Sequence, residues 1–202
     1  MKKETLYVAF STQKGGVGKT TFTVLVASYL YYLKGYNVAV VDCDYPQHSI
    51  SAMRKRDAEQ VNGDDYYKQL AFHQFKALGK KAYPVLCSSP DEAIKTADEY
   101  LASAGSDYDV VFFDLPGTVN SEGVIHSLSG MDYIFTPIAA DRVVLESSLS
   151  FAVAIHKLLV KNEACRLKGL YLFWNMVDGR EKTDLYTLYE PVSYTHLRAH
   201  ET

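Results

Sequence analysis

Cysteine is scarce in this sequence, and so are long apolar runs. The three cysteines among 202 residues, Cys43, Cys87 and Cys165, are widely spaced, which predicts reduced thiols and excludes a disulfide-rich secreted fold. No stretch approaches the roughly 18 uninterrupted apolar residues that would span a bilayer. The apolar segment after the N-terminal lysines is too short for a secretory signal. We therefore expect a cytoplasmic protein without a transmembrane segment.

A strong excess of charge of either sign is also missing. The chain carries 21 Lys and Arg against 24 Asp and Glu, a formal net charge of -3, so it has no overall attraction for nucleic acid or acidic lipid. Such a partner would have to bind a local patch. Basic clusters occur at residues 54–56 and 80–81, but acidic residues lie near them in the sequence. We interpret both clusters as solvated helix faces.

A glycine-rich segment, residues 11–21, joins a short apolar run to a longer one. Three glycines in four positions let the backbone N–H groups point inward, and a helix starting near Lys19 adds the positive end of its dipole. The pattern predicts a phosphate-binding loop in which Lys19 contacts the β- and γ-phosphates and the Thr20 hydroxyl ligates Mg²⁺. A glycine-rich surface turn is the alternative. The residues predicted to bind nucleotide here are Lys14, Gly15, Gly16, Val17, Gly18, Lys19, Thr20 and Thr21.

The loop departs from the general phosphate-loop pattern at Gln13, where that pattern has glycine. With Lys14 next to it, the segment resembles the deviant phosphate loop of the ParA/MinD family of ATPases, and Gln13 is more similar to the ParA branch. The resemblance implies ATP and Mg²⁺ as cofactors. It also implies that Lys14 reaches across a nucleotide-sandwich homodimer to the phosphates bound by the partner subunit.

Apolar runs alternate with segments of helical periodicity along the chain. The runs at 38–41 and 109–113 are continuously apolar except for one terminal aspartate, as in parallel strands covered on both faces. This alternation predicts an α/β fold with a doubly wound, mainly parallel sheet and helices on both faces. The predicted strands are 6–10, 38–41, 83–87, 109–113, 133–137 and 167–173, and the predicted helices are 22–33, 50–62, 65–78, 90–104, 120–128, 143–160 and 182–190.

Aspartates follow two of the predicted strands. Asp42 and Asp44 come after residue 41, and Asp114 comes after residue 113, at the carboxyl edge where open α/β sheets bind ligands. Asp114 is therefore the candidate to hold Mg²⁺, usually through a water. By the resemblance, Asp44 positions or activates the attacking water, and Asp42 supports the Mg²⁺ shell and the switch loop. Helix capping or turn formation is an open alternative for Asp42.

The resemblance is imperfect after the second strand. The family typically reads Asp-x-Asp-Pro-Gln there, whereas this chain has an additional Tyr45, which leaves open which aspartate faces the γ-phosphate. The predicted catalytic residues are Lys14, Lys19 and Asp44. The lysines would spread the charge that develops on the transferring phosphoryl group, and Asp44 would accept a hydrogen bond from the attacking water. Asn175 matches the family asparagine that binds the edge of the adenine. The alternative, that Asn175 is a turn residue, is nearly as well supported.

The C-terminal region is the least regular part of the sequence. We expect residues 1–190 to form a single phosphate-loop ATPase domain that lacks the last strand and helix of the family fold. Residues 191–202 show neither helical nor strand periodicity and resemble translated adapter sequence. A genuine short polar tail is the alternative.

The resemblance covers most of residues 4–180 and implies a slow ATPase that acts as a timer. ATP closes the dimer, the dimer binds a surface or partner, and hydrolysis to ADP and phosphate releases it. The expected role is partition or positioning of plasmid, chromosome or mobile-element DNA. Nonspecific DNA and a ParB-like or other stimulating protein are the expected partners.

Several other functions remain open at this level. A MinD-like positioning ATPase that cycles on a membrane would need a C-terminal amphipathic helix. An iron–sulfur reductase component would need cysteines facing a dimer axis. A simple phosphotransferase would not need Lys14, and an inert fragment would bind nucleotide without closing a dimer.

Overall fold

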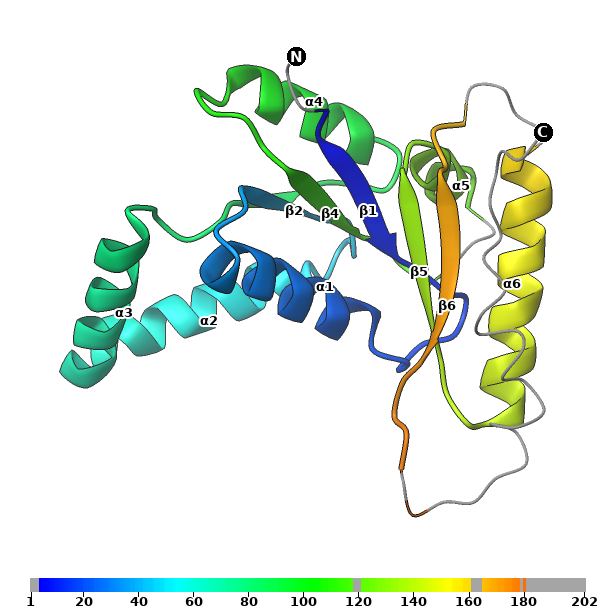
Figure 1. Cartoon of the computed structure of the whole chain (residues 1–202), viewed down its shortest axis with the longest axis horizontal. Helices are drawn as coiled ribbons and strands as arrows, with labels where there is room; N and C mark the ends of the chain where they lie inside the picture. The colour runs from blue at the N-terminus through cyan, green and yellow to red at the C-terminus, as the bar shows by residue number, and fades with distance from the viewer. Residues whose placement is uncertain (1–3, 118–120, 161–164, 179, 181–202) are drawn as a thin grey trace.

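The chain folds around one parallel sheet (Figure 1). The computed structural model describes residues 4–117, 121–160, 165–178 and 180. Within them, six strands pair in parallel in the order β3-β2-β4-β1-β5-β6. The strands are β1 (Leu6–Phe10), β2 (Val38–Asp42), β3 (Val85–Cys87), β4 (Val110–Asp114), β5 (Tyr133–Ile138) and β6 (Gly169–Trp174).

Helices cover both faces of the sheet, so the predicted doubly wound α/β fold is confirmed. One face packs on α1 (Lys19–Ser28) and α2 (Ser49–Gly63). The other face packs on α4 (Ala93–Ser103), α5 (Glu122–Ser129) and α6 (Arg142–Val160). Every residue of β2 and β4 is buried, because these strands are covered on both sides. Figure 1 shows α3 (Asp65–Leu78) beside α2, extending away from the sheet.

The first helix begins at Lys19, as the glycine-rich loop predicts and three residues before the apolar segment 22–33. Gly18 adopts a φ of 98° and ends the loop there, a conformation that glycine tolerates best. Its continuation, Tyr29–Leu33, is π-helical. The other predicted elements agree with the structure to within three residues at each end. The predicted helix at 182–190 and the tail at 191–202 lie outside the described residues.

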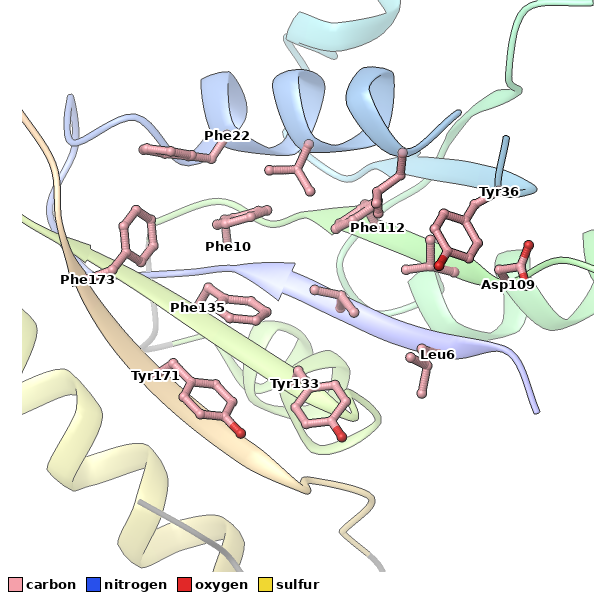
Figure 2. A pocket seen from close by; sticks show the side chains of 14 residues that line it. Leu6, Phe10, Phe22, Tyr36, Asp109, Phe112, Tyr133, Phe135, Tyr171 and Phe173 are labelled. Carbon is pink, nitrogen blue, oxygen red and sulfur yellow. The ribbon is translucent and has the colours of Figure 1, made fainter. Parts of the chain in front are cut away.

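An apolar groove of about 740 Å³ runs along the sheet beside α1 (Figure 2). Phenylalanine and tyrosine rings from β1, α1, β5 and β6 line it. Phe22 of α1 lies edge-on to Phe173 of β6 at 4.8 Å between ring centroids, and Phe135 stacks on Tyr171 at 5.4 Å. Aromatic carbon dominates this surface, so the groove offers few polar groups for chemistry.

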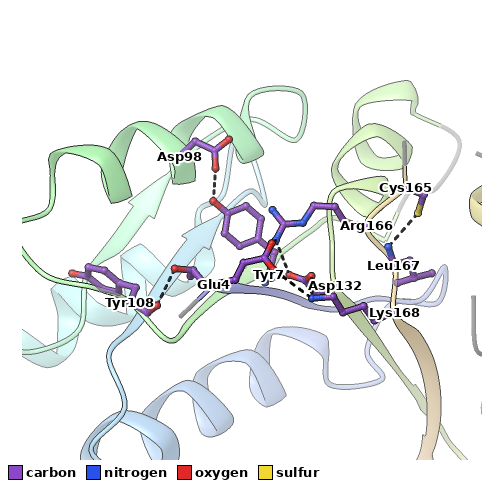
Figure 3. Close-up of polar contacts among 10 residues, drawn as sticks. Glu4, Tyr7, Asp98, Tyr108, Asp132, Cys165, Arg166, Leu167 and Lys168 are labelled. Atoms are coloured by element: carbon purple, nitrogen blue, oxygen red, sulfur yellow. Dashed lines mark hydrogen bonds and ion pairs between the residues drawn. The ribbon is translucent and has the colours of Figure 1, made fainter. Parts of the chain in front are cut away.

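A buried carboxylate joins three strands near their amino ends (Figure 3). Asp132 precedes β5, and its Oδ2 accepts hydrogen bonds from the backbone N–H of Tyr7 at 2.7 Å and from Arg166 at 3.1 Å. Lys168 Nζ lies 2.9 Å from the other oxygen of Asp132. These contacts fasten the segment before β6 to β1 and β5, at the edge of the sheet opposite to the glycine-rich loop.

Two of the expectations concern the state of the cysteines and the presence of a membrane-spanning helix. The three cysteines are free thiols in the structure. Among the described helices, none combines the length and the apolar character needed to cross a membrane.

Candidate functional site

The glycine-rich loop connects β1 to α1 at the carboxyl edge of the sheet. Gly16 and Gly18 have positive φ angles of 76° and 98°, and the carbonyl oxygen of Gly18 accepts the N–H of Phe22 at 2.8 Å to begin the helix. A Cβ atom on Gly18 would lie 2.9 Å from Asn175 Nδ2. Both the backbone conformation and this close approach therefore favour glycine at position 18.

Lys19 folds back over the loop. Its Nζ donates to the carbonyl oxygen of Lys14 at 3.3 Å, and a Cβ atom on Gly117 would lie only 3.2 Å from the same nitrogen. Burial lowers the pKa of Lys19, whereas the negative charges of Asp114 and Asp44 raise it. The cation thus lies close enough to both carboxylates to interact with their charge.

Thr20 and Asp114 meet beneath the loop. Thr20 Oγ1 donates to Asp114 Oδ2 at 2.8 Å. Asp114 is 1% exposed, and its Oδ1 has no hydrogen-bond partner among the described residues. Burial raises the pKa of Asp114 to about 6; the Thr20 hydrogen bond and Lys19 oppose this shift, and the charges of Asp42 and Asp44 add to it. A buried carboxylate oxygen without a partner is costly, and a bound cation would compensate it.

Asp42 lies directly beside Asp114. The two residues are opposed in the parallel register of β2 and β4, and Asp42 is fully buried. Its Oδ2 accepts the backbone N–H of Ser51 at 2.9 Å, and its Oδ1 accepts that of Asp44 at a longer 3.4 Å. The Asp42 carboxylate therefore holds the first turn of α2 against the end of β2.

Asp44 lies in the loop between β2 and α2 and is half-buried. Its Oδ2 accepts the hydroxyl of Ser49 at 3.1 Å. The inserted Tyr45 is 68% exposed, and its ring contacts His48 at 5.8 Å between centroids. The insertion therefore sits on the outside of the loop, with Asp42 buried on one side of it and Asp44 left partly accessible.

Lys14 is exposed at the loop, whereas Asn175 is hydrogen-bonded to it. Lys14 is exposed, and its ammonium group has no hydrogen bond or ion pair to the rest of the described chain. Asn175 follows β6, and its Nδ2 donates to the carbonyl oxygen of Val17 at 2.9 Å. Its backbone N–H donates to Ile138 at the end of β5. The end of β6 is thereby tied to the loop.

The basic clusters are partly used inside the molecule. The guanidinium of Arg54 lies 4.3 Å from the ring centroid of Tyr83, and Arg56 pairs with Asp57 at 2.9 Å. Lys80 donates to the carbonyl oxygen of Gly35 at 2.8 Å. Arg54 and Lys80 therefore contact other parts of the chain, whereas the Arg56–Asp57 ion pair is exposed on the helix surface.

Comparison with known families decides which group of proteins this loop and these aspartates belong to. A family model for the CobQ/CobB/MinD/ParA nucleotide binding domain matches residues 8–192, which include the loop, the three aspartates and Asn175. The chain belongs to this family. The ParA/MinD resemblance is thereby confirmed.

Members of the CobQ/CobB/MinD/ParA family with similar sequences or structures include partition proteins. The chromosome-partitioning ATPase Soj of Thermus thermophilus is 28% identical over 205 residues, which cover 96% of this chain and 76% of Soj. A plasmid partition protein from Borrelia burgdorferi superposes with a TM-score of 0.63 at 19% identity, over 96% of this chain and 87% of that one. The structure of pNOB8 ParA bound to nonspecific DNA superposes with a TM-score of 0.56 at 18% identity, over 95% of this chain and 77% of that one. At these identities, the structural likeness shows the fold alone.

Some contacts in this family member were not foreseen from the sequence. Ser49 and the backbone of Ser51 bind Asp44 and Asp42, and Gly117 leaves space for the head group of Lys19. Serines in the first turn of a predicted helix are a capping signal. That signal, read together with the preceding aspartates, could have indicated the first two contacts.

Proposed function

We propose that this protein is a ParA-type ATPase that dimerises on binding ATP, hydrolyses it to ADP and phosphate, and drives partition or positioning of plasmid, chromosome or mobile-element DNA in the cytoplasm. The observation that carries the proposal is the pair Thr20 and Asp114, 2.8 Å apart beneath a glycine-rich loop. A hydroxyl and a carboxylate placed there are the protein groups that a nucleotide-bound Mg²⁺ needs.

Mg²⁺ fits the oxygen atoms at this site. No group of three or more His, Cys, Asp and Glu side chains that could hold a metal occurs in the described part of the chain. Mg²⁺ commonly binds through one or two protein oxygens, with nucleotide phosphates and waters completing its shell. The hydroxyl of Thr20 and the unpartnered Oδ1 of Asp114 are such oxygens, and Asp42 supports them by holding the start of α2 beside Asp114. When bound, the ion would neutralise charge on the phosphates.

The remaining roles follow from charge and position. The backbone N–H groups of the loop would hold the phosphates, and Lys19 lies against the loop where it can spread the charge of the transferring group. Asp44 has one oxygen engaged by Ser49 and is the acceptor for the attacking water. Asn175 has its Nδ2 committed to Val17, so its Oδ1 would accept a hydrogen bond from the adenine amino group. That arrangement favours ATP over GTP, which has an acceptor at the corresponding position.

Exposure of Lys14 supports the homodimer. A lysine in a phosphate loop whose ammonium has no described partner in its own subunit is free to reach a phosphate in another subunit. Partition proteins among the relatives, and the neighbour whose structure contains nonspecific DNA, support DNA as the surface. A ParB-like protein that stimulates hydrolysis would be the further partner.

The solution mass of the Asp44→Ala variant tests the proposal. Removal of the acceptor for the water should slow hydrolysis and trap the ATP-bound dimer. Light scattering after gel filtration should show a monomer with Mg²⁺ and ADP and a dimer with Mg²⁺ and ATP. A monomer in both conditions would contradict the dimer switch.

If the dimer forms, the surface that it binds can be tested with the same sample. DNA of arbitrary sequence and vesicles containing anionic lipid should be compared in a sedimentation assay with ADP and with ATP. Binding to DNA with ATP alone supports partition. Binding to vesicles alone would favour a MinD-like membrane cycle instead.

A further inference from the structure

The first turn of α2 is built around the two aspartates that follow β2. The residue before the helix, His48, has a φ of 43° and makes no side-chain capping hydrogen bond. The hydroxyl of Ser49, the first residue of the helix, donates to Asp44 Oδ2 at 3.1 Å. A serine at a helix start commonly caps the N–H groups of its own helix. Here its hydroxyl bonds a carboxylate of the candidate site instead.

The two aspartates are held in different ways. Asp42 is buried, and backbone N–H groups bind both of its carboxylate oxygens. Asp44 is half-buried, and within the described residues Ser49 is the donor to its carboxylate. The main chain of Asp44 is fixed separately, because its carbonyl oxygen accepts the N–H of His48 at 2.8 Å. The freedom left to Asp44 is therefore rotation of its side chain, which the Ser49 hydroxyl restricts.

We propose that Ser49 is a positioning residue that orients the carboxylate of Asp44 toward the phosphate site. This inference rests on the proposed ATPase function. Ser49 engages Oδ2, which leaves Oδ1 as the acceptor for a water. Because Ser49 makes no hydrogen bond to the phosphate loop in the described structure, it should affect the hydrolytic step and leave nucleotide affinity unchanged.

Ser49→Thr and Ser49→Val form a matched pair for the test. Threonine and valine have nearly the same shape, and only threonine retains the hydroxyl. With Mg²⁺ and saturating ATP, phosphate release by Ser49→Val should fall about tenfold in kcat, the effect expected from loss of one hydrogen bond to a charged group. Ser49→Thr should stay within about twofold of the wild type, and KM should change little in both variants. Ser103→Ala, which removes an exposed hydroxyl at the far end of α4, is the remote control.

A second measurement separates positioning from a general loss of structure. In an Asp44→Ala background, Ser49→Val should have no additional effect on kcat, because the group that it orients is gone. A tenfold effect that persists without Asp44, or equal activity of the threonine and valine variants, would overturn the proposal. Thermal unfolding of each variant shows whether its chain is folded.

Failure of the proposed function would look different. If the wild-type chain neither binds ATP nor releases phosphate, the ATPase assignment fails, and the role of Ser49 fails with it. If the wild type is active and Ser49→Val matches it, the ATPase assignment stands and the role of Ser49 is wrong.

Discussion

Replacement of Asp114 by asparagine should stabilise the nucleotide-free protein at neutral pH and abolish its response to Mg²⁺ and ATP. Asparagine keeps the size of the side chain and an acceptor for the Thr20 hydroxyl, but it removes a buried negative charge. Burial raises the pKa of Asp114 from its ordinary 3.8 to about 6. At 1.36 kcal/mol per pKa unit, that shift corresponds to about 3 kcal/mol of native-state free energy.

The pH dependence of this effect has a definite sign. Because the pKa of Asp114 is higher in the native state than in the unfolded state, the native state binds more protons between about pH 4 and pH 6. The stability of the wild type therefore falls as pH rises through that window. The advantage of Asp114→Asn should be about 1 kcal/mol at pH 4.5 and reach about 2 to 3 kcal/mol at pH 8, where it corresponds to roughly 5 to 10 °C in Tm for a chain of this size.

Thermal unfolding in EDTA without nucleotide, at pH 4.5 and pH 8, measures this difference. Addition of Mg²⁺ and ATP at pH 8, with ATP at about 100 times its Kd, should then stabilise the wild type by about 2.7 kcal/mol. The stability of the variant should not change. A wild type that is as stable as the variant at pH 8 would refute the reasoning, because it would mean that the Asp114 charge is compensated in the free protein.

Two further substitutions test the loop itself. Lys19→Ala should weaken ATP binding by about 100-fold or more in calorimetry, because a charge-assisted contact to phosphate is lost; an ATP-dependent dimer of this variant would contradict the assigned role. Gly18→Ala should destabilise the protein by about 2 to 3 kcal/mol, from the positive φ and from displacement of Asn175 from Val17. In an Asn175→Ala background, the loss of unfolding free energy caused by Gly18→Ala, measured with denaturant, should be about 1 kcal/mol smaller. An unchanged loss would mean that displacement of Asn175 does not contribute to the destabilisation.

The strands best predicted from the sequence are those buried on both faces. β2 and β4 are short apolar runs that end in aspartate, and such runs have few alternative structures in a chain with alternating helices. The apolar pattern alone would place the start of α1 at residue 22, because Lys19, Thr20 and Thr21 carry no apolar periodicity; the glycine-rich loop indicated the start near Lys19. The loop conformation, and not a hydrophobic pattern, sets that boundary.

The site was predictable to the extent that topology determines it. The loop and the aspartates follow strands, and parallel strands bring their carboxyl ends to one edge. The contact of Asn175 with Val17 depends on the position of β6 next to β5, which alternation of elements does not specify. The bond from Ser49 to Asp44 depends on the path of a six-residue loop with an insertion. Local propensity does not encode such a path.

The place of β1 in the sheet has a consequence for synthesis of the protein. β1 is made before the other five described strands, yet its neighbours are β4 and β5, so its edges have no partner among these strands until residue 110 and then residue 133 have been made. Asp114 and Asn175 are also made long after the loop that they contact. A nascent chain that ends before β6 therefore carries the phosphate loop without its completed surroundings, and nucleotide can help folding only late in translation.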